Sequence, residues 1–265
     1  MSRIHRALEK AREKRKEHKL TTGSASPLEK IIYTDSHVVP VCHTQLEKNR
    51  VVSRSSNDPR SQLFRTLRTT ILKQMRAHNW RSIGITSPSP GEGKSLIASN
   101  LAAAIAMEVN YTALLVDMDL RHPGVTDYFA IEPELGLGDY LKGEAEIGDL
   151  LVNPGVERLL LLPGRGSLEN SSELISSPRM VALFNEVSQR YKSRIVVYDM
   201  PAILPRDDVL AALNRVDCFL MVIEEGRDSE VDIRKAIQSM HNANIIGTVI
   251  NKSQTVESGY MPSVA

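Results

Sequence analysis

The chain has 265 residues, 42% hydrophobic and 25% charged, which is ordinary for a soluble α/β protein. Its 33 Lys and Arg residues nearly balance 32 Asp and Glu residues, so the net charge of +1 gives no reason to expect a nucleic-acid partner. Two cysteines, Cys42 and Cys218, form neither a disulfide framework nor a zinc motif. Apolar runs stay far below the roughly 18 to 20 residues that span a bilayer, and the charged N-terminus lacks a signal-peptide core. A cytoplasmic protein is therefore expected.

Composition changes along the first 60 residues. Residues 2–18 are rich in helix formers, and their apolar residues form only a narrow stripe on a basic helix. The narrow stripe favours a partner-binding helix over the alternative, a membrane-surface anchor. From about Leu20 to Pro59 the chain is polar without a clear period, which is typical of a linker or a poorly ordered arm. The expected division is a basic amphipathic helix (1–19), this arm (20–59), a folded P-loop ATPase/kinase domain (60–253) and a flexible C-terminal tail (254–265).

The folded domain begins with an amphipathic helix predicted over 61–75. Beyond it, near-continuous apolar strands alternate with amphipathic helices, which indicates an α/β fold with a doubly wound, mainly parallel sheet flanked by helices. The strands are predicted at 82–87, 112–118, 158–162, 194–199, 218–223 and 245–250, and the helices at 94–108, 138–142, 178–191, 207–215 and 229–241.

A Gly-rich loop, Ser87 to Ser95, follows the first of these strands and leads into a helix. Gly91 and Gly93 allow successive backbone N–H groups to point at phosphate oxygens, and the helix N-terminus adds a favourable dipole. Lys94 is expected to contact the β- and γ-phosphates, and the Ser95 hydroxyl to ligate Mg²⁺. Pro88 replaces the first glycine of the usual motif. The predicted nucleotide-binding residues of the loop are Pro90, Gly91, Glu92, Gly93, Lys94, Ser95 and Leu96.

Two further strands end in carboxylates. One ends in Asp117 and Asp119, and another in Asp199. Ligands bind at the carboxyl ends of the strands in a doubly wound sheet, so Asp117 and Asp119 are expected to project towards the loop. Asp199 is expected to hold Mg²⁺, which prefers oxygen ligands. The alternative for all three is an ordinary strand-end turn residue.

The last strand runs into Asn251-Lys252-Ser253-Gln254, which resembles the base-reading Asn-Lys-x-Asp motif of guanine-specific proteins. Gln254 replaces the Asp that selects guanine. Asn251 is therefore predicted to contact adenine, and the nucleotide to be ATP. A simple strand-end Asn is the alternative.

Three segments carry a wider resemblance: Ser-Pro-Gly-Glu-Gly-Lys-Ser (89–95), Leu-Leu-Val-Asp-Met-Asp-Leu-Arg-His-Pro (114–123) and Val-Val-Tyr-Asp-Met-Pro (196–201). Together they resemble the bacterial tyrosine kinases (BY-kinases) of capsule and exopolysaccharide synthesis, in the P-loop ATPase superfamily that includes MinD and ParA. Ser89 stands where MinD and ParA proteins carry a signature lysine, which favours the kinase branch. Residues 2–10, 162–165 and 171–180 look most similar to the exosortase-associated tyrosine autokinase subgroup.

The resemblance implies autophosphorylation on tyrosine from Mg-ATP, in the regulation of exopolysaccharide or capsule polymerisation and export. By motif position, Asp117 would orient or deprotonate the tyrosine hydroxyl, and Arg121 would help with charge on the phosphates. Asp119 would support the metal together with Asp199. The implied catalytic residues are Lys94, Asp117, Asp119 and Arg121, and the implied metal ligands are Ser95, Asp119 and Asp199.

Family members also carry a Glu-x-x-Arg-x-x-Arg helix through which subunits form rings. The matching positions here are Gln62, Arg65 and Arg68, so a homo-oligomeric ring is expected, with a solvated helix face as the alternative. The resemblance further implies a membrane-spanning chain-length (co-polymerase) partner, a phosphotyrosine phosphatase, and a position at the periphery of the inner membrane through that partner.

The family's C-terminal tail is commonly a cluster of tyrosines, whereas Tyr260 is the only tyrosine at this end of the chain. Tyr260 is the predicted phosphoacceptor, and a frayed tail with an incidental tyrosine is the alternative. The single tyrosine also motivates a second hypothesis, a nucleotide-dependent assembly switch that uses ATP without phosphorylating tyrosine.

Overall fold

A computed structural model describes residues 37–39, 41–55, 58–189, 193–205 and 208–253. The predicted N-terminal helix, residues 20–36 of the predicted arm and the tail with Tyr260 lie outside the described residues. Within the described ranges, one sheet contains strands β1 (His37–Val38), β2 (Ser82–Thr86), β3 (Thr112–Asp117), β4 (Val152–Asn153), β5 (Leu159–Leu162), β6 (Arg194–Asp199), β7 (Cys218–Glu224) and β8 (Ile245–Asn251).

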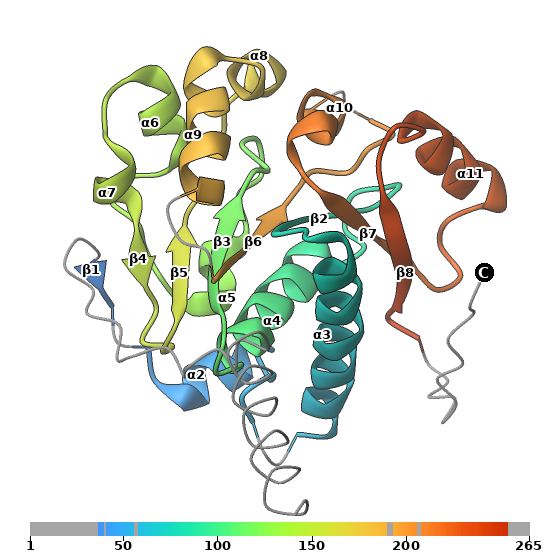
Figure 1. The fold of residues 1–265 in the computed structure, drawn as a ribbon, viewed down its shortest axis with the longest axis horizontal. Helices are drawn as coiled ribbons and strands as arrows, with labels where there is room; N and C mark the ends of the chain where they lie inside the picture. The colour runs from blue at the N-terminus through green and yellow to red at the C-terminus, as the bar shows by residue number, and fades with distance from the viewer. Residues whose placement is uncertain (1–36, 40, 56–57, 190–192, 206–207, 254–265) are drawn as a thin grey trace, which may run out of the picture. The chain divides into compact units, whose positions relative to one another are not determined.

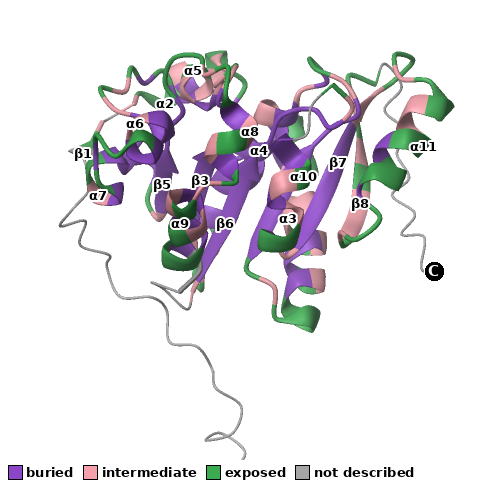
Figure 2. Ribbon diagram, turned by 90° about the horizontal axis from the view of Figure 1, so that it is seen from above, coloured by how far each residue is buried: buried purple, intermediate pink, exposed green. Residues whose placement is uncertain are grey.

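The order of the strands confirms the predicted doubly wound class. It is β1-β4-β5-β3-β6-β2-β7-β8, so β2 lies between β6 and β7 near the middle of the sheet. Every neighbouring pair is parallel except β4 with β5, which is antiparallel. Figure 2 shows the central strands buried and the edge strand β8 more exposed, as expected for a sheet covered on both faces.

The helices are α2 (His43–Lys48), α3 (Pro59–His78), α4 (Lys94–Ala106), α5 (Val125–Phe129), α6 (Leu137–Lys142), α7 (Ile147–Leu150), α8 (Ser171–Ile175), α9 (Pro178–Gln189), α10 (Asp208–Ala212) and α11 (Glu230–Ser239), with a 3-10 turn at Leu213–Arg215. Apolar side chains of α2, α3, α4 and α5 pack on one face of the sheet, and those of α6, α9, α10 and α11 on the other (Figure 1). No helix in the described ranges is both long and apolar enough to cross a membrane.

The second half of the predicted arm is part of this fold. β1 pairs with β4, and α2 buries Leu46 on the same face as α4. The chain then buries Val51, Val52 and Ser53 before α3 begins. The expectation of a linker or poorly ordered arm is therefore corrected for residues 37–55. A polar segment without periodicity gave no local signal of this packing.

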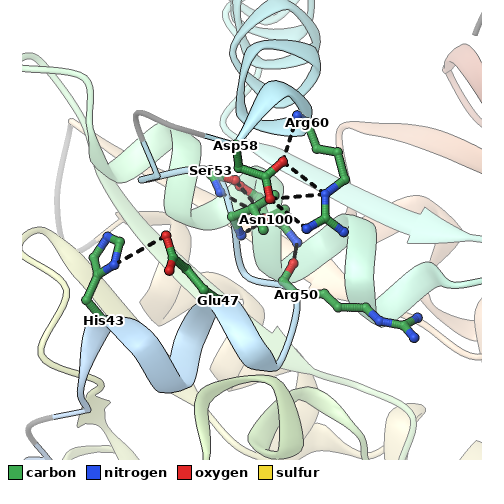
Figure 3. Close-up of polar contacts among 8 residues, drawn as sticks. His43, Glu47, Arg50, Ser53, Asp58, Arg60 and Asn100 are labelled. Atoms are coloured by element: carbon green, nitrogen blue, oxygen red, sulfur yellow. Dashed lines mark hydrogen bonds and ion pairs between the residues drawn. The ribbon is translucent and has the colours of Figure 1, made fainter.

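One side chain of α4 holds this segment in place (Figure 3). The fully buried Asn100 accepts hydrogen bonds at Oδ1 from the backbone N–H groups of Val52 (2.8 Å) and Ser53 (3.2 Å). Its Nδ2 donates to the carbonyl oxygen of Arg50 (2.9 Å), and the Ser53 hydroxyl donates to the Asn100 carbonyl (2.6 Å). Buried backbone groups need such partners, so Asn100 satisfies the polar groups that this irregular segment brings into the core.

Asn100→Ala is expected to lower the free energy of unfolding by about 2 to 4 kcal/mol, because the buried N–H groups of Val52 and Ser53 and the part-buried carbonyl of Arg50 lose their partner. Urea denaturation followed by circular dichroism measures the change. The exposed Asn242 supplies a matched control, and Asn242→Ala should stay within about 0.5 kcal/mol of the wild type. Equal stability of the two variants would contradict the role of Asn100.

Candidate functional site

The Gly-rich loop leaves β2 and enters α4 with the backbone that the sequence predicted. Gly91 and Gly93 have φ angles of 85° and 95°, in the left-handed region that favours glycine. A Cβ on Gly93 would lie 2.2 Å from Nδ2 of Asn251, so a side chain has no room there. Gly93 precedes the first residue of α4, Lys94, which is only 7% exposed. The loop therefore presents a helix N-terminus and a lysine together, a ready anion site.

The end of β8 supports this loop from behind. Asn251 Nδ2 donates to the carbonyl oxygen of Glu92 (2.7 Å), and Lys252 Nζ donates to that of Gly91 (2.9 Å). Lys252 also pairs with Glu224 at the end of β7 (2.8 Å). The side-chain amide of Asn251 thus donates a hydrogen bond to the loop backbone, a role that the sequence pattern did not predict. Its contact with adenine stays a prediction.

Asp117 and Asp199 lie opposite each other at the ends of β3 and β6. Asp117 is fully buried, and its Oδ2 accepts hydrogen bonds from the backbone N–H groups of Gly124 and Val125, both at 3.0 Å. Burial, and then the charge of Asp199, raise the pKa of Asp117 well above its ordinary value. Asp117 therefore anchors the first N–H groups of α5. Its raised pKa also means that it binds a proton more readily than an ordinary aspartate.

Asp199 is also fully buried, and neither of its carboxylate oxygens has a hydrogen bond of good geometry. Burial raises its pKa to about 7, although the Ser95 hydroxyl and the Lys94 charge oppose this change. A buried carboxylate without donors is costly unless a cation compensates it. Asp199 together with Ser95 and Asp119 fits a Mg²⁺ ion, which takes oxygen ligands.

The described residues contain no group of three or more His, Cys, Asp or Glu side chains placed to hold a metal alone. The proposed ion would instead be a magnesium ion bound together with a nucleotide. Such ions take one or two carboxylates and complete their shell with phosphate oxygens and water.

A cavity of about 350 Å³ opens over the loop, a size within the usual range of small-ligand sites. Arg121 is not among its lining residues, because its Nε donates to Ser171 Oγ (2.8 Å) at the start of α8. The lining includes the predicted residues Pro90, Gly91, Gly93, Lys94, Ser95 and Asp119, and also His122, Tyr128, Ala202 and Pro205, which sequence reasoning missed.

The predicted residues outside the lining are placed around the cavity rather than on it. The Glu92 side chain is buried behind the loop, the Asp199 side chain is buried at the end of β6, and Leu96 lies in the first turn of α4. Tyr128 was missed because α5 is too short to show a hydrophobic period. Burial, and then Asp199, raise the pKa of the Tyr128 hydroxyl.

The arginines predicted for oligomerisation make contacts within the chain. Arg68 forms an ion pair with Glu108 (2.9 Å) and donates to the carbonyl oxygen of Ala104 (3.2 Å). Arg65 donates to Ser61 Oγ (2.9 Å), one turn earlier in α3. Gln62 is exposed. The Arg68 contacts hold α3 against the end of α4, the Arg65 contact lies within α3, and the ring contact of Gln62, Arg65 and Arg68 stays a prediction.

Comparisons with known proteins agree with this site, although no family model matches the chain. Succinoglycan biosynthesis transport protein ExoP of Rhizobium meliloti (strain 1021) is 31% identical over 216 residues, 80% of this chain and 27% of ExoP. Tyrosine-protein kinase YwqD of Bacillus subtilis (strain 168) is 29% identical over 222 residues, 82% of this chain and 92% of YwqD. The kinase domain of Escherichia coli tyrosine kinase ETK is similar with a TM-score of 0.70 at 25% identity, covering 90% of this chain and 100% of that domain.

The extent of these similarities differs between the relatives. The chain spans about a quarter of the length of ExoP and of the putative tyrosine-protein kinase EpsB, but nearly all of YwqD and of the ETK domain. The shared region contains the Gly-rich loop, Asp117 and Asp199. With this loop, these strand-end carboxylates and this similarity, the chain resembles the bacterial tyrosine kinases over most of its length.

Proposed function

We propose that the chain is an ATP-dependent protein-tyrosine autokinase that regulates the polymerisation and export of exopolysaccharide or capsule. The observation that carries the proposal is the buried Asp199 carboxylate, which has no hydrogen bond of good geometry and lies beside Ser95 and Lys94 near the cavity of about 350 Å³ over the loop. The printed names of YwqD and ETK support the tyrosine kinase activity, and the name of ExoP supports the polysaccharide process.

In this proposal the loop N–H groups and Lys94 hold the β- and γ-phosphates of ATP, as helix N-termini and P-loop lysines do. Ser95, Asp119 and Asp199 would hold Mg²⁺, which neutralises charge on the phosphates. The tyrosine oxygen attacks the γ-phosphorus, the bond to ADP breaks, and Asp117 accepts the phenolic proton. The raised pKa of Asp117 suits an acceptor of that proton.

The proposed partners follow from the same assignment. They are a second copy of the chain in a ring, formed through Gln62, Arg65 and Arg68, a membrane-spanning chain-length protein that brings the kinase to the inner membrane, and a phosphotyrosine phosphatase. Tyr260 is the proposed phosphoacceptor, Arg121 the proposed residue for phosphate charge, and Asn251 the proposed adenine contact. The name of ExoP as a transport protein supports the membrane partner.

Incubation of the full chain with Mg-ATP, alone and with its membrane partner, is expected to give phosphotyrosine detectable by mass spectrometry. Lys94→Ala should lower the rate by at least about 100-fold, because the γ-phosphate loses its charged contact. An unchanged thermal melting profile shows that the variant is folded. If phosphotyrosine is absent from the wild type under both conditions, the kinase proposal is wrong.

Tyr260→Phe is expected to remove most of the phosphotyrosine while ATP hydrolysis continues, because the phenyl ring keeps its shape but loses the acceptor oxygen. Tyr111 lies just before the amino end of β3, whereas the loop lies at the carboxyl ends of the strands, so Tyr111→Phe is the matched control and should retain phosphotyrosine. ATP-dependent assembly without any phosphotyrosine would favour the assembly switch instead.

Asp199→Asn tests the metal site through stability. The pKa of Asp199 is raised from 3.8 to about 7 in the folded state, so folding favours its protonated form. This contribution to stability is complete below about pH 4 and is lost as the pH rises through 7. Without Mg²⁺ at pH 8, Asp199→Asn should therefore be more stable than the wild type by about 1 to 3 kcal/mol.

Mg-ATP should reverse that order. It should raise the melting temperature of the wild type, whose carboxylate then has its cation, and have little effect on Asp199→Asn. Differential scanning fluorimetry with and without Mg-ATP measures both effects. A wild type that is more stable than the variant at pH 8 without metal would rule out an uncompensated Asp199 carboxylate.

A further inference from the structure

Glu92 stands between the two glycines of the loop, yet its side chain is not part of the cavity. The residue is completely buried, and the cavity is lined by Gly91 and Gly93 but not by Glu92. Its Oε1 accepts a hydrogen bond from the backbone N–H of Ser89 at 2.6 Å. Its Oε2 is buried and accepts no hydrogen bond. Half of this carboxyl group therefore organises the loop, and the other half lacks a donor.

Asp228, in the segment between β7 and α11, lies within hydrogen-bonding reach of Glu92. Its Oδ2 is also buried and without a donor. Two carboxylates cannot bond to each other, whereas a carboxylic acid donates to a carboxylate. Burial, and then the neighbouring Asp228, raise the pKa of Glu92 from 4.5 to about 7. One proton between Glu92 and Asp228 supplies the donor that both oxygen atoms lack.

Three cations lie near this pair, and two of them, Arg227 and Lys252, are paired with Glu224. Lys94, at the start of α4, faces Glu92 and favours its ionised form, but burial outweighs this effect. Arg227 precedes Asp228 and pairs with Glu224 at 3.0 Å. Lys252, after β8, pairs with the same Glu224 and donates to the carbonyl oxygen of Gly91. None of these contacts replaces a proton between the two carboxyl groups.

We propose that Glu92 is a positioning residue that, when protonated, bridges the Ser89 amide and Asp228 and so holds the loop ready for nucleotide phosphates. Loss of the proton breaks the bridge and places two negative charges behind the loop. Bound phosphates favour the protonated form for the same electrostatic reason, so nucleotide binding takes up a proton. The inference rests on the proposed nucleotide site but not on transfer of phosphate to tyrosine.

The size of the effect follows from the protonated fraction. For a pKa of about 7, this fraction falls from about nine tenths at pH 6 to about one tenth at pH 8. If the protonated form is the competent one, the apparent Kd for nucleotide rises by about tenfold over this range. Glu92→Gln keeps both hydrogen bonds without a titrating proton, since its amide oxygen accepts from Ser89 and its amide nitrogen donates to Asp228.

The experiment measures the Kd of the full chain for Mg-ATP between pH 6 and pH 8 by calorimetry, in buffers of different ionisation enthalpy. The ratio of wild type to Glu92→Gln at each pH removes the titration of ATP itself. That ratio is expected to rise about tenfold, with proton uptake at pH 7.5 in the wild type and none in the variant. Glu144→Gln, at an exposed position after α6, should follow the wild type.

Asp228→Asn gives a second, independent test, because its amide can donate to an ionised Glu92 without a shared proton. Its Kd should change with pH less than that of the wild type. A constant ratio between wild type and Glu92→Gln, together with equal proton uptake, would overturn the proposal. Absence of Mg-ATP binding at every pH would overturn the nucleotide site as well, whereas pH-dependent binding without kinase activity would support the inference and count against the kinase alone.

Discussion

The site depends on two buried carboxylates held opposite each other by the register of β3 and β6. Asp117 and Asp199 occupy paired positions at the carboxyl ends of these strands, and both are fully inaccessible to solvent. Each charge opposes the other, so the ends of the strands need hydrogen-bond donors or a cation. Asp117 accepts hydrogen bonds from the first N–H groups of α5, whereas Asp199 has the Ser95 hydroxyl nearby but no hydrogen bond of good geometry. This asymmetry gives one carboxylate a structural anchor and makes the other available to a metal.

Local patterns in the sequence predicted the loop and the strand-end carboxylates, because each of these features depends on residues that are adjacent in the chain. An apolar run that ends in Asp marks the edge of a parallel sheet, and two glycines before a lysine mark a loop that must turn into a helix. The structure places Lys94 and Asp199 together through strands β2 and β6, which are neighbours in the sheet. The same patterns predicted the central strands of the sheet within one or two residues.

Features that depend on contacts between distant residues could not be predicted in this way. Asn100 orders a segment about 50 residues before it, and Asn251 reaches back about 160 residues to the loop backbone. Nothing in the sequence near either asparagine indicates its partner. Arg121 follows a family motif, yet its side chain contacts Ser171 rather than the cavity. A motif fixes which residue type is present, whereas the packing of other elements decides where its side chain points.

Carboxyl groups lie on two sides of the loop, so the positive charge of Lys94 alone does not neutralise the site. Asp199 lies on the side of α4 and β6, and Glu92 and Asp228 lie behind the loop, while Lys94 acts on both groups. One lysine cannot compensate three carboxyl groups, of which Glu92 and Asp199 are fully buried, so the balance must come from cations that exchange with solvent. A magnesium ion can serve Asp199 and a proton can serve Glu92, and both are favoured when phosphates arrive. Under the two proposals made above, the affinity of the loop for phosphate would depend on the supply of two small cations as well as on the fold.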